Sequence, residues 1–124
     1  MNIADFTEEQ RVALLDLLVL AMYMDGKLAS AEETRVQQLL VAMGLSSVYD
    51  RNRQFDASVT RVRPYAQSAG AARECITGLA GNFTTPEQQR IVHDILHDLV
   101  ASDGEVCAEE KRFLHYIGEA FGFY

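Results

Sequence analysis

The two ends of the sequence repeat each other, without a gap, when the chain is shifted by 78 residues. Ten of the 39 positions from 7 to 45 are identical to their shifted partners, whereas average composition predicts roughly two or three. The identical pairs are Thr7/Thr85, Glu9/Glu87, Gln10/Gln88, Asp16/Asp94, Leu18/Leu96, Asp25/Asp103, Gly26/Gly104, Glu32/Glu110, Ala42/Ala120 and Gly44/Gly122. We therefore expect two related units packed around a pseudo-twofold axis.

Each copy has the pattern of a helix–turn–helix hairpin, because apolar residues recur at spacings of three and four. Capping boxes, in which a polar side chain and a backbone N–H exchange hydrogen bonds, predict where helices begin. These boxes are Thr7 with Gln10, Ser30 with Glu33, and Thr85 with Gln88. Gly44 and Gly122 are suited to end the second helix of each copy, because glycine tolerates a positive φ.

Between the copies, the sequence predicts two inserted helices over about 47–80, with a break at Arg63-Pro64 and the second helix running from Pro64 to Ala80. The expected fold is thus a single all-α domain over 1–124, with about six helices. Its repeat copies span about 7–45 and 85–123. The segment from Val12 to Met24 is apolar except for Asp16, which predicts a central, buried helix.

The net charge of −7 argues against binding to nucleic acid or anionic lipid. The apolar run from Leu17 to Met24 is too short to span a bilayer, and the N-terminus carries no export signal. We therefore expect a cytoplasmic protein without direct membrane insertion. The aromatic C-terminal run, Phe121 to Tyr124, is expected either to dock on the core or to form a dimer contact, so monomer and homodimer both remain open.

No arrangement of residues indicates an enzyme. Cys75 and Cys107 form neither a CxxC metal motif nor a disulfide framework, and both are expected to be buried free thiols. No nucleophile motif and no phosphate-binding glycine loop is present. His93 and His97 have a metal-ligand spacing, but they lie off the apolar stripe and lack an obvious third ligand, so a solvated helix face is favoured.

The turn within each copy reads D-G-x-[LV]-x-x-x-E, which matches the second half of an EF-hand calcium loop. The positions that would hold the first two ligands are Ala21 and Tyr23 in one copy, and Leu99 and Ala101 in the other. Because none carries a carboxylate, neither turn is expected to bind calcium alone.

Three interpretations of the turns stay open. They are structural joints, they form an acidic docking face for a basic partner, or together they hold a hard cation. In the last case the candidate ligands are Asp25, Glu32, Asp103 and Glu110, and Ca²⁺ or Mg²⁺ is the expected ion. A metal-dependent hydrolase using the same carboxylates is the least favoured hypothesis.

The segments Met24 to Leu28 with Glu32-Glu33, and Ala101 to Val106 with Glu109 to Leu114, resemble the TerB-like domains of tellurite-resistance proteins. The resemblance implies an all-α domain with paired acidic turns and a link to tellurite or other stress, with metal binding. We therefore expect a non-enzymatic binding module. The alternative is a helical protein-interaction adaptor with purely structural turns and an unidentified, basic partner.

Overall fold

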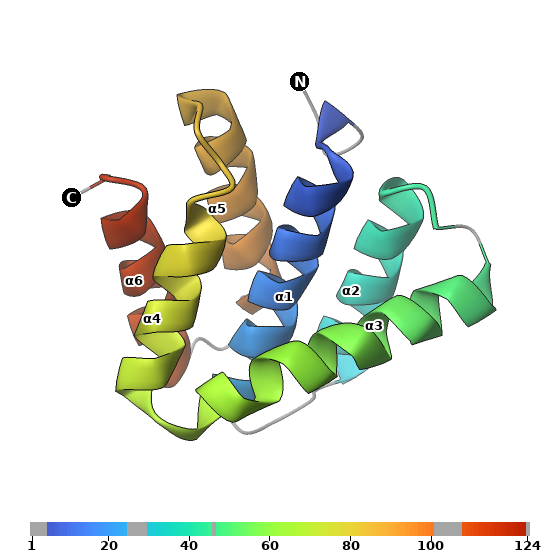
Figure 1. Cartoon of the computed structure of the whole chain (residues 1–124), viewed down its shortest axis with the longest axis horizontal. Coiled ribbons are helices and arrows are strands. Elements are labelled where there is room, and N and C mark those ends of the chain that lie inside the picture. The colour runs from blue at the N-terminus through green and yellow to red at the C-terminus, as the bar shows by residue number, and fades with distance from the viewer. Residues whose placement is uncertain (1–4, 25–29, 46, 101–107, 124) are drawn as a thin grey trace.

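A computed structural model describes residues 5–24, 30–45, 47–100 and 108–123. These residues form six α-helices and a 3₁₀ helix, η2, with no strand among them (Figure 1). The elements are α1 (Glu8–Met24), α2 (Ser30–Ala42), α3 (Val48–Val62), η2 (Arg63–Gln67), α4 (Ala69–Ala80), α5 (Pro86–Val100) and α6 (Ala108–Ala120). The predicted all-α fold is confirmed. None of the described helices is long and apolar enough to cross a membrane.

The helices of the two repeat copies begin and end at related positions. The bounds of α2 and α6 differ by 78 residues at both ends, and α1 and α5 also begin 78 residues apart. The pairing of helices follows the same relation: α1 contacts α2 as α5 contacts α6, and α1 contacts α6 as α2 contacts α5. A pseudo-twofold axis that exchanges the two copies would turn each contact of a pair into the other, so these contacts agree with the expected arrangement.

The caps of the two copies are built alike. The N–H of Thr7 donates to Gln10 Oε1 at 3.0 Å, and the N–H of Gln10 donates to Thr7 Oγ1 at 3.1 Å. The equivalent bonds between Thr85 and Gln88 measure 3.4 and 3.2 Å. These two predicted capping boxes are confirmed, and the side chains of the third, Ser30 and Glu33, lie outside the described set.

The second helix of each copy ends in a Schellman motif, in which the two residues beyond the helix bond back to its last turn. Gly44 has a φ of 99°, and Leu45 N–H donates to Leu40 O at 3.0 Å. Gly122 has a φ of 76°, and Phe123 N–H donates to Gly118 O at 2.8 Å. The role predicted for both glycines is confirmed.

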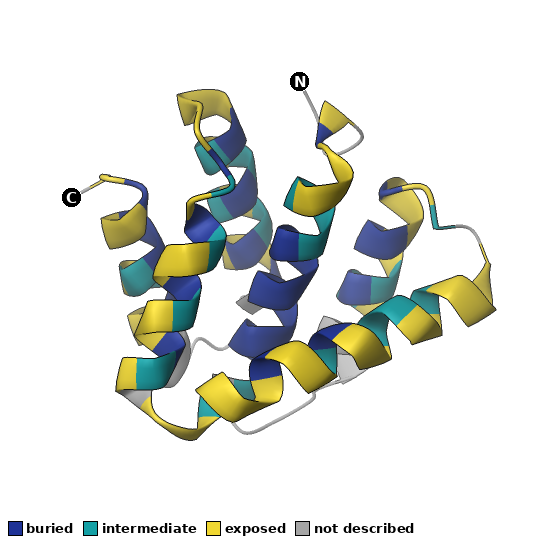
Figure 2. Ribbon diagram, viewed as in Figure 1, coloured by how far each residue is buried: buried dark blue, intermediate teal, exposed yellow. Residues whose placement is uncertain are grey.

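Helix α1 is the centre of the bundle. All ten residues from Ala13 to Met22 are buried, and α1 contacts each of the other five α-helices (Figure 2). The buried, central position predicted from its apolar run is confirmed. By contrast, α3, α4 and α5 each present one exposed face to solvent.

The inserted segment differs from the prediction at one point. A single helix was expected from Pro64 to Ala80, but the chain forms η2 and then turns at Ser68, whose backbone is extended (φ −147°, ψ 153°). Ser68 Oγ accepts a hydrogen bond from the N–H of Ala71 at 3.1 Å and so starts α4 as its N-cap. The prediction was wrong because it overlooked this serine as a start signal.

Candidate functional site

The predicted cation ligands can be placed only in part. Asp25 and Asp103 lie outside the described residues, and Glu32 and Glu110 lie in the first turns of α2 and α6, with side chains also outside the described set. The carboxyl ends of α1 and α5 and the amino ends of α2 and α6 lie at the same end of the bundle (Figure 1). A site shared by the two turns stays a prediction.

Among the described residues, the histidines do not form a metal site. Within the part of the chain that the structure describes, no three His, Cys, Asp or Glu residues are grouped to hold an ion. The ring of His93 packs edge-on against Phe123, with centroids 5.3 Å apart, and His97 is exposed. His115 lies 3.6 Å from Glu119 on its own helix.

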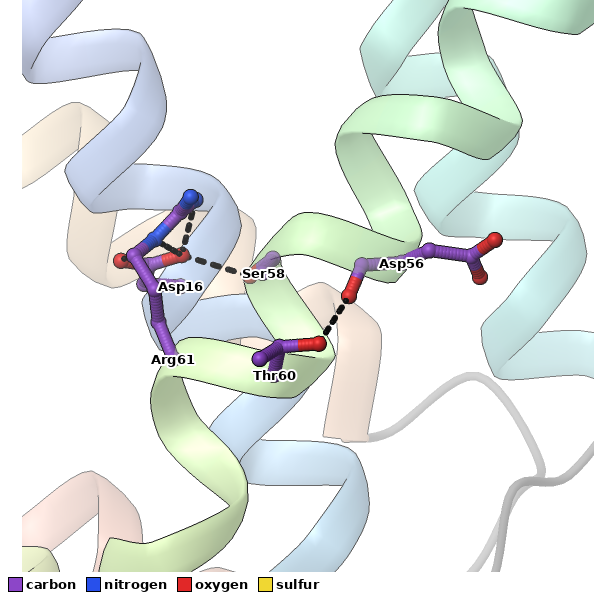
Figure 3. A network of polar contacts seen from close by, with 5 residues as sticks. All are labelled: Asp16, Asp56, Ser58, Thr60 and Arg61. Carbon is purple, nitrogen blue, oxygen red and sulfur yellow. Dashed lines mark hydrogen bonds and ion pairs between the residues drawn. The ribbon is translucent and has the colours of Figure 1, made fainter.

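The structure adds a polar network that the sequence did not predict, centred on Asp16 of α1 (Figure 3). Ser58 Oγ donates to Asp16 Oδ1 at 2.6 Å. The guanidinium of Arg61 clamps the same carboxylate, with Nη2 2.8 Å from Oδ1 and Nε 3.1 Å from Oδ2. Both partners come from α3, so the network joins the inserted segment to the central helix.

Burial gives this network its energetic weight. The Asp16 side chain is only 7% exposed and Ser58 is fully buried, whereas the side chain of Arg61 is 43% exposed. A buried carboxylate is costly unless it is paired and hydrogen-bonded, and Arg61 with Ser58 meets both needs. One signal in the sequence pointed here: Asp16 is the only charged residue in an otherwise apolar run of a central helix.

Cys75 of α4 lies beside this network and is half-buried and free, which departs from the full burial expected from sequence. Burial raises the pKa of its thiol, and the negative charge of Asp16 raises it further. The thiol therefore stays protonated at neutral pH and is a poor nucleophile. The other cysteine, Cys107, lies outside the described residues.

Two hollows meet at Asp16 and Leu79, between α1 and α4. The larger, with a volume of about 560 Å³, reaches Arg61, Tyr65 and Glu74. The smaller, about 390 Å³, is lined by Glu8 and Glu9 of α1 and by Asn82, which follows α4. Because they share two lining residues, the hollows adjoin each other along the interface of α1 and α4, and together they are called the groove below.

The acidic turns and the order of the helices point to one family of helical domains. Comparison with curated proteins and with solved structures found no match. A family model described as tellurite resistance protein TerB matches residues 11–124, which confirms the resemblance seen in the turns: the chain belongs to the TerB family.

Proposed function

We propose that this chain is a binding module that holds a divalent cation, Ca²⁺ or Mg²⁺, between its two acidic turns. The ligands in this proposal are the carboxylates of Asp25, Glu32, Asp103 and Glu110. Hard cations of this kind take oxygen ligands, and each turn alone supplies too few. TerB domains are generally not enzymes, which favours a binding role over a hydrolytic one.

One observation carries the proposal: the four helix ends that flank the turns lie at the same end of the bundle (Figure 1). The mutual contacts of α1, α2, α5 and α6 support it, because they hold the two hairpins against each other.

The family description supports a role in resistance to tellurite or related stress. In this proposal the cation-bound form is the one that acts in the response. A strain that lacks the gene and is complemented with Asp25→Asn/Asp103→Asn is then expected to remain as sensitive to tellurite as the uncomplemented strain. Full rescue by this variant would separate the stress role from cation binding.

Thermal unfolding tests cation binding directly. The protein is stripped with EDTA and then melted with Ca²⁺, Mg²⁺, Mn²⁺ or Zn²⁺. An ion present at a hundred times its Kd and bound only by the folded state stabilises by about 2.7 kcal/mol, which raises the Tm of a chain this size by about 10 °C.

The double variant Asp25→Asn/Asp103→Asn is expected to lose this rise in Tm. Asp94→Asn is the control, because it removes an exposed carboxylate of α5 that is not one of the four proposed ligands. The control should respond to the ion as the wild type does. No shift in Tm with any of the four ions would contradict the proposal.

A further inference from the structure

We propose that the groove between α1 and α4 binds a basic amphipathic helix of another protein. This proposal goes beyond the cation site and does not depend on it, because the groove uses none of the four predicted ligands. Four features of the groove carry it: an apolar floor, an acidic rim, an exposed aromatic ring and an opening at a glycine.

The floor of the groove is apolar. Val12 and Ala13 of α1 and Leu79 of α4 line the smaller hollow, and Val62 lines the larger one. Val12 and Leu79 are only half-buried, so apolar surface remains for a partner to cover. Covering such a surface favours association by about 25 cal/mol per Å² before the cost of ordering.

The rim of the groove is acidic. Glu8, Glu9 and Glu74 are exposed along it. Arg61, the one basic residue among the described lining residues, is already paired with Asp16. The lining groups together carry a net charge of −3, which complements Lys and Arg flanking the apolar stripe of a helix.

The far end of the groove holds an exposed aromatic ring. Tyr65 in η2 is 44% exposed and lines the larger hollow together with Glu74. A Lys or Arg placed there lies close to an exposed carboxylate and to an exposed tyrosine ring. Cation–π contact adds roughly 0.5–1 kcal/mol at such an exposed site.

Gly78 leaves the wall of the groove open. It lies within α4, is exposed, lacks a positive φ, and a Cβ built on it meets nothing within 4 Å. A glycine in a helix costs up to about 1 kcal/mol relative to alanine. Nothing inside the fold requires glycine here, and unlike Gly70 this glycine lines the larger hollow, so the missing side chain leaves room there for another backbone to approach α4.

The length of the groove sets the size of the partner segment. Its lining residues on and after α4 run from Glu74 to Asn82, which corresponds to about 12 Å along a helix axis. A partner helix of about three turns covers this length, with its apolar stripe on the floor and its basic residues over both rims.

A designed peptide serves as the probe: an amphipathic helix of about 12 residues made only of Leu and Lys at helical spacing. Its Kd is measured by fluorescence anisotropy at low and at high salt. We expect micromolar affinity that weakens as salt rises, because exposed charges provide much of the attraction. A peptide of the same composition with its stripe scrambled should bind about tenfold more weakly. Equal binding of the two peptides, or none, would overturn the proposal.

Two matched pairs of variants locate the binding. Gly78→Leu fills the opening and should weaken binding about tenfold, whereas Gly70→Leu, at the other exposed glycine of α4, should leave the Kd within about twofold. Leucine is a better helix former than glycine, so both variants should fold, which circular dichroism checks. Equal Kd values for the two variants overturn the proposal.

The second pair reverses charge. Glu9→Lys/Glu74→Lys should weaken binding at least tenfold. Glu87→Lys/Asp94→Lys makes the same change in net charge on α5, and Glu87 is the repeat partner of Glu9, so a smaller loss of about threefold is expected. A loss of equal size would assign the binding to overall charge and reject the groove. Backbone amide shifts on titration should fall on α1, α4 and η2; shifts confined to α5 and α6 would also reject it.

Discussion

Asp16 and Asp94 occupy the same position in the two repeat copies, but one side chain is buried and the other is exposed to solvent. The carboxylate of Asp16 is buried and held by Arg61 and Ser58. The side chain of Asp94 is 65% exposed, with His93 Nδ1 3.8 Å and Arg90 Nε 4.0 Å away on the same helix. One sequence position therefore supports the core in one copy and faces solvent in the other.

The inserted segment is the cause of this difference. Helix α3 contacts α1 and supplies both partners of Asp16, whereas the main contacts of α5 are with α1, α2 and α6. As a result, α1 is buried over its whole middle, while α5 keeps a polar face. Equivalent residues of the two copies can therefore contribute differently to stability. The helices that pack against each copy decide whether a polar group is buried and paired or exposed.

The largest expected difference in stability is between substitutions of the two aspartates. Asp16→Ala should lower the free energy of unfolding by about 3 kcal/mol, because it leaves the buried Ser58 hydroxyl and the Arg61 guanidinium without their acceptor. Asp94→Ala should change it by less than about 0.5 kcal/mol. Urea unfolding with a common m-value measures both. Similar losses in the two variants would break the comparison.

The arginine partners should differ in the same direction. Arg61→Leu should cost about 2 kcal/mol, since it leaves a buried carboxylate with only Ser58, and the 43% exposure of the Arg61 side chain keeps the loss below that of a fully buried pair. Arg90→Leu removes only an exposed pair within one helix and should cost less than about 0.5 kcal/mol. Guanidinium unfolding midpoints would show this, and a larger loss for Arg90→Leu would refute it.

The glycine ends of the copies should instead behave alike. Gly44→Ala and Gly122→Ala should each lower stability by about 1 kcal/mol, because both force alanine into a positive φ and neither has a steric clash to add. Gly70→Ala is the control without a positive φ and should be neutral or slightly stabilising. Thermal unfolding that separates the first two by more than about 1 kcal/mol would show that the motifs are not equivalent.

The smallest effect concerns pH. Burial, and secondly Asp16, raise the pKa of the Cys75 thiol above its ordinary value of 9.0. As pH rises past 9.0, the unfolded thiol loses its proton first, so the folded state binds more protons and the free energy of unfolding falls. This loss should be a fraction of a kcal/mol, and it should vanish in Cys75→Ala.

Alkylation by iodoacetamide in a Cys107→Ala background reports the same pKa. The rate should rise at higher pH than for a free thiol, and Asp16→Asn should move the profile towards lower pH. Asp94→Asn should leave it unchanged, because that carboxylate is not among the groups that raise this pKa. Identical profiles in all three proteins would show that the charge of Asp16 does not reach Cys75.

Much of the fold was predictable because it rests on local interactions. The capping boxes at Thr7 and Thr85 join residues three apart, and the helix ends at Gly44 and Gly122 follow from glycine itself. The turn at Ser68 is also a local feature, but the prediction placed the helix start at Pro64 and did not treat Ser68 as an N-cap. The acidic turns identified the family, although the four proposed ligands themselves stay a prediction.

By itself, the sequence determined the helices, their repeat and the central position of α1, because hydrogen bonds over three or four residues and apolar periodicity act within short stretches of chain. Only the tertiary structure decided that Asp16 is clamped while Asp94 is solvated, and that α1 and α4 leave an acidic groove. Ser58 and Arg61 lie 42 and 45 residues from Asp16 along the chain, so their pairing depends on how α3 crosses α1 and not on any local pattern.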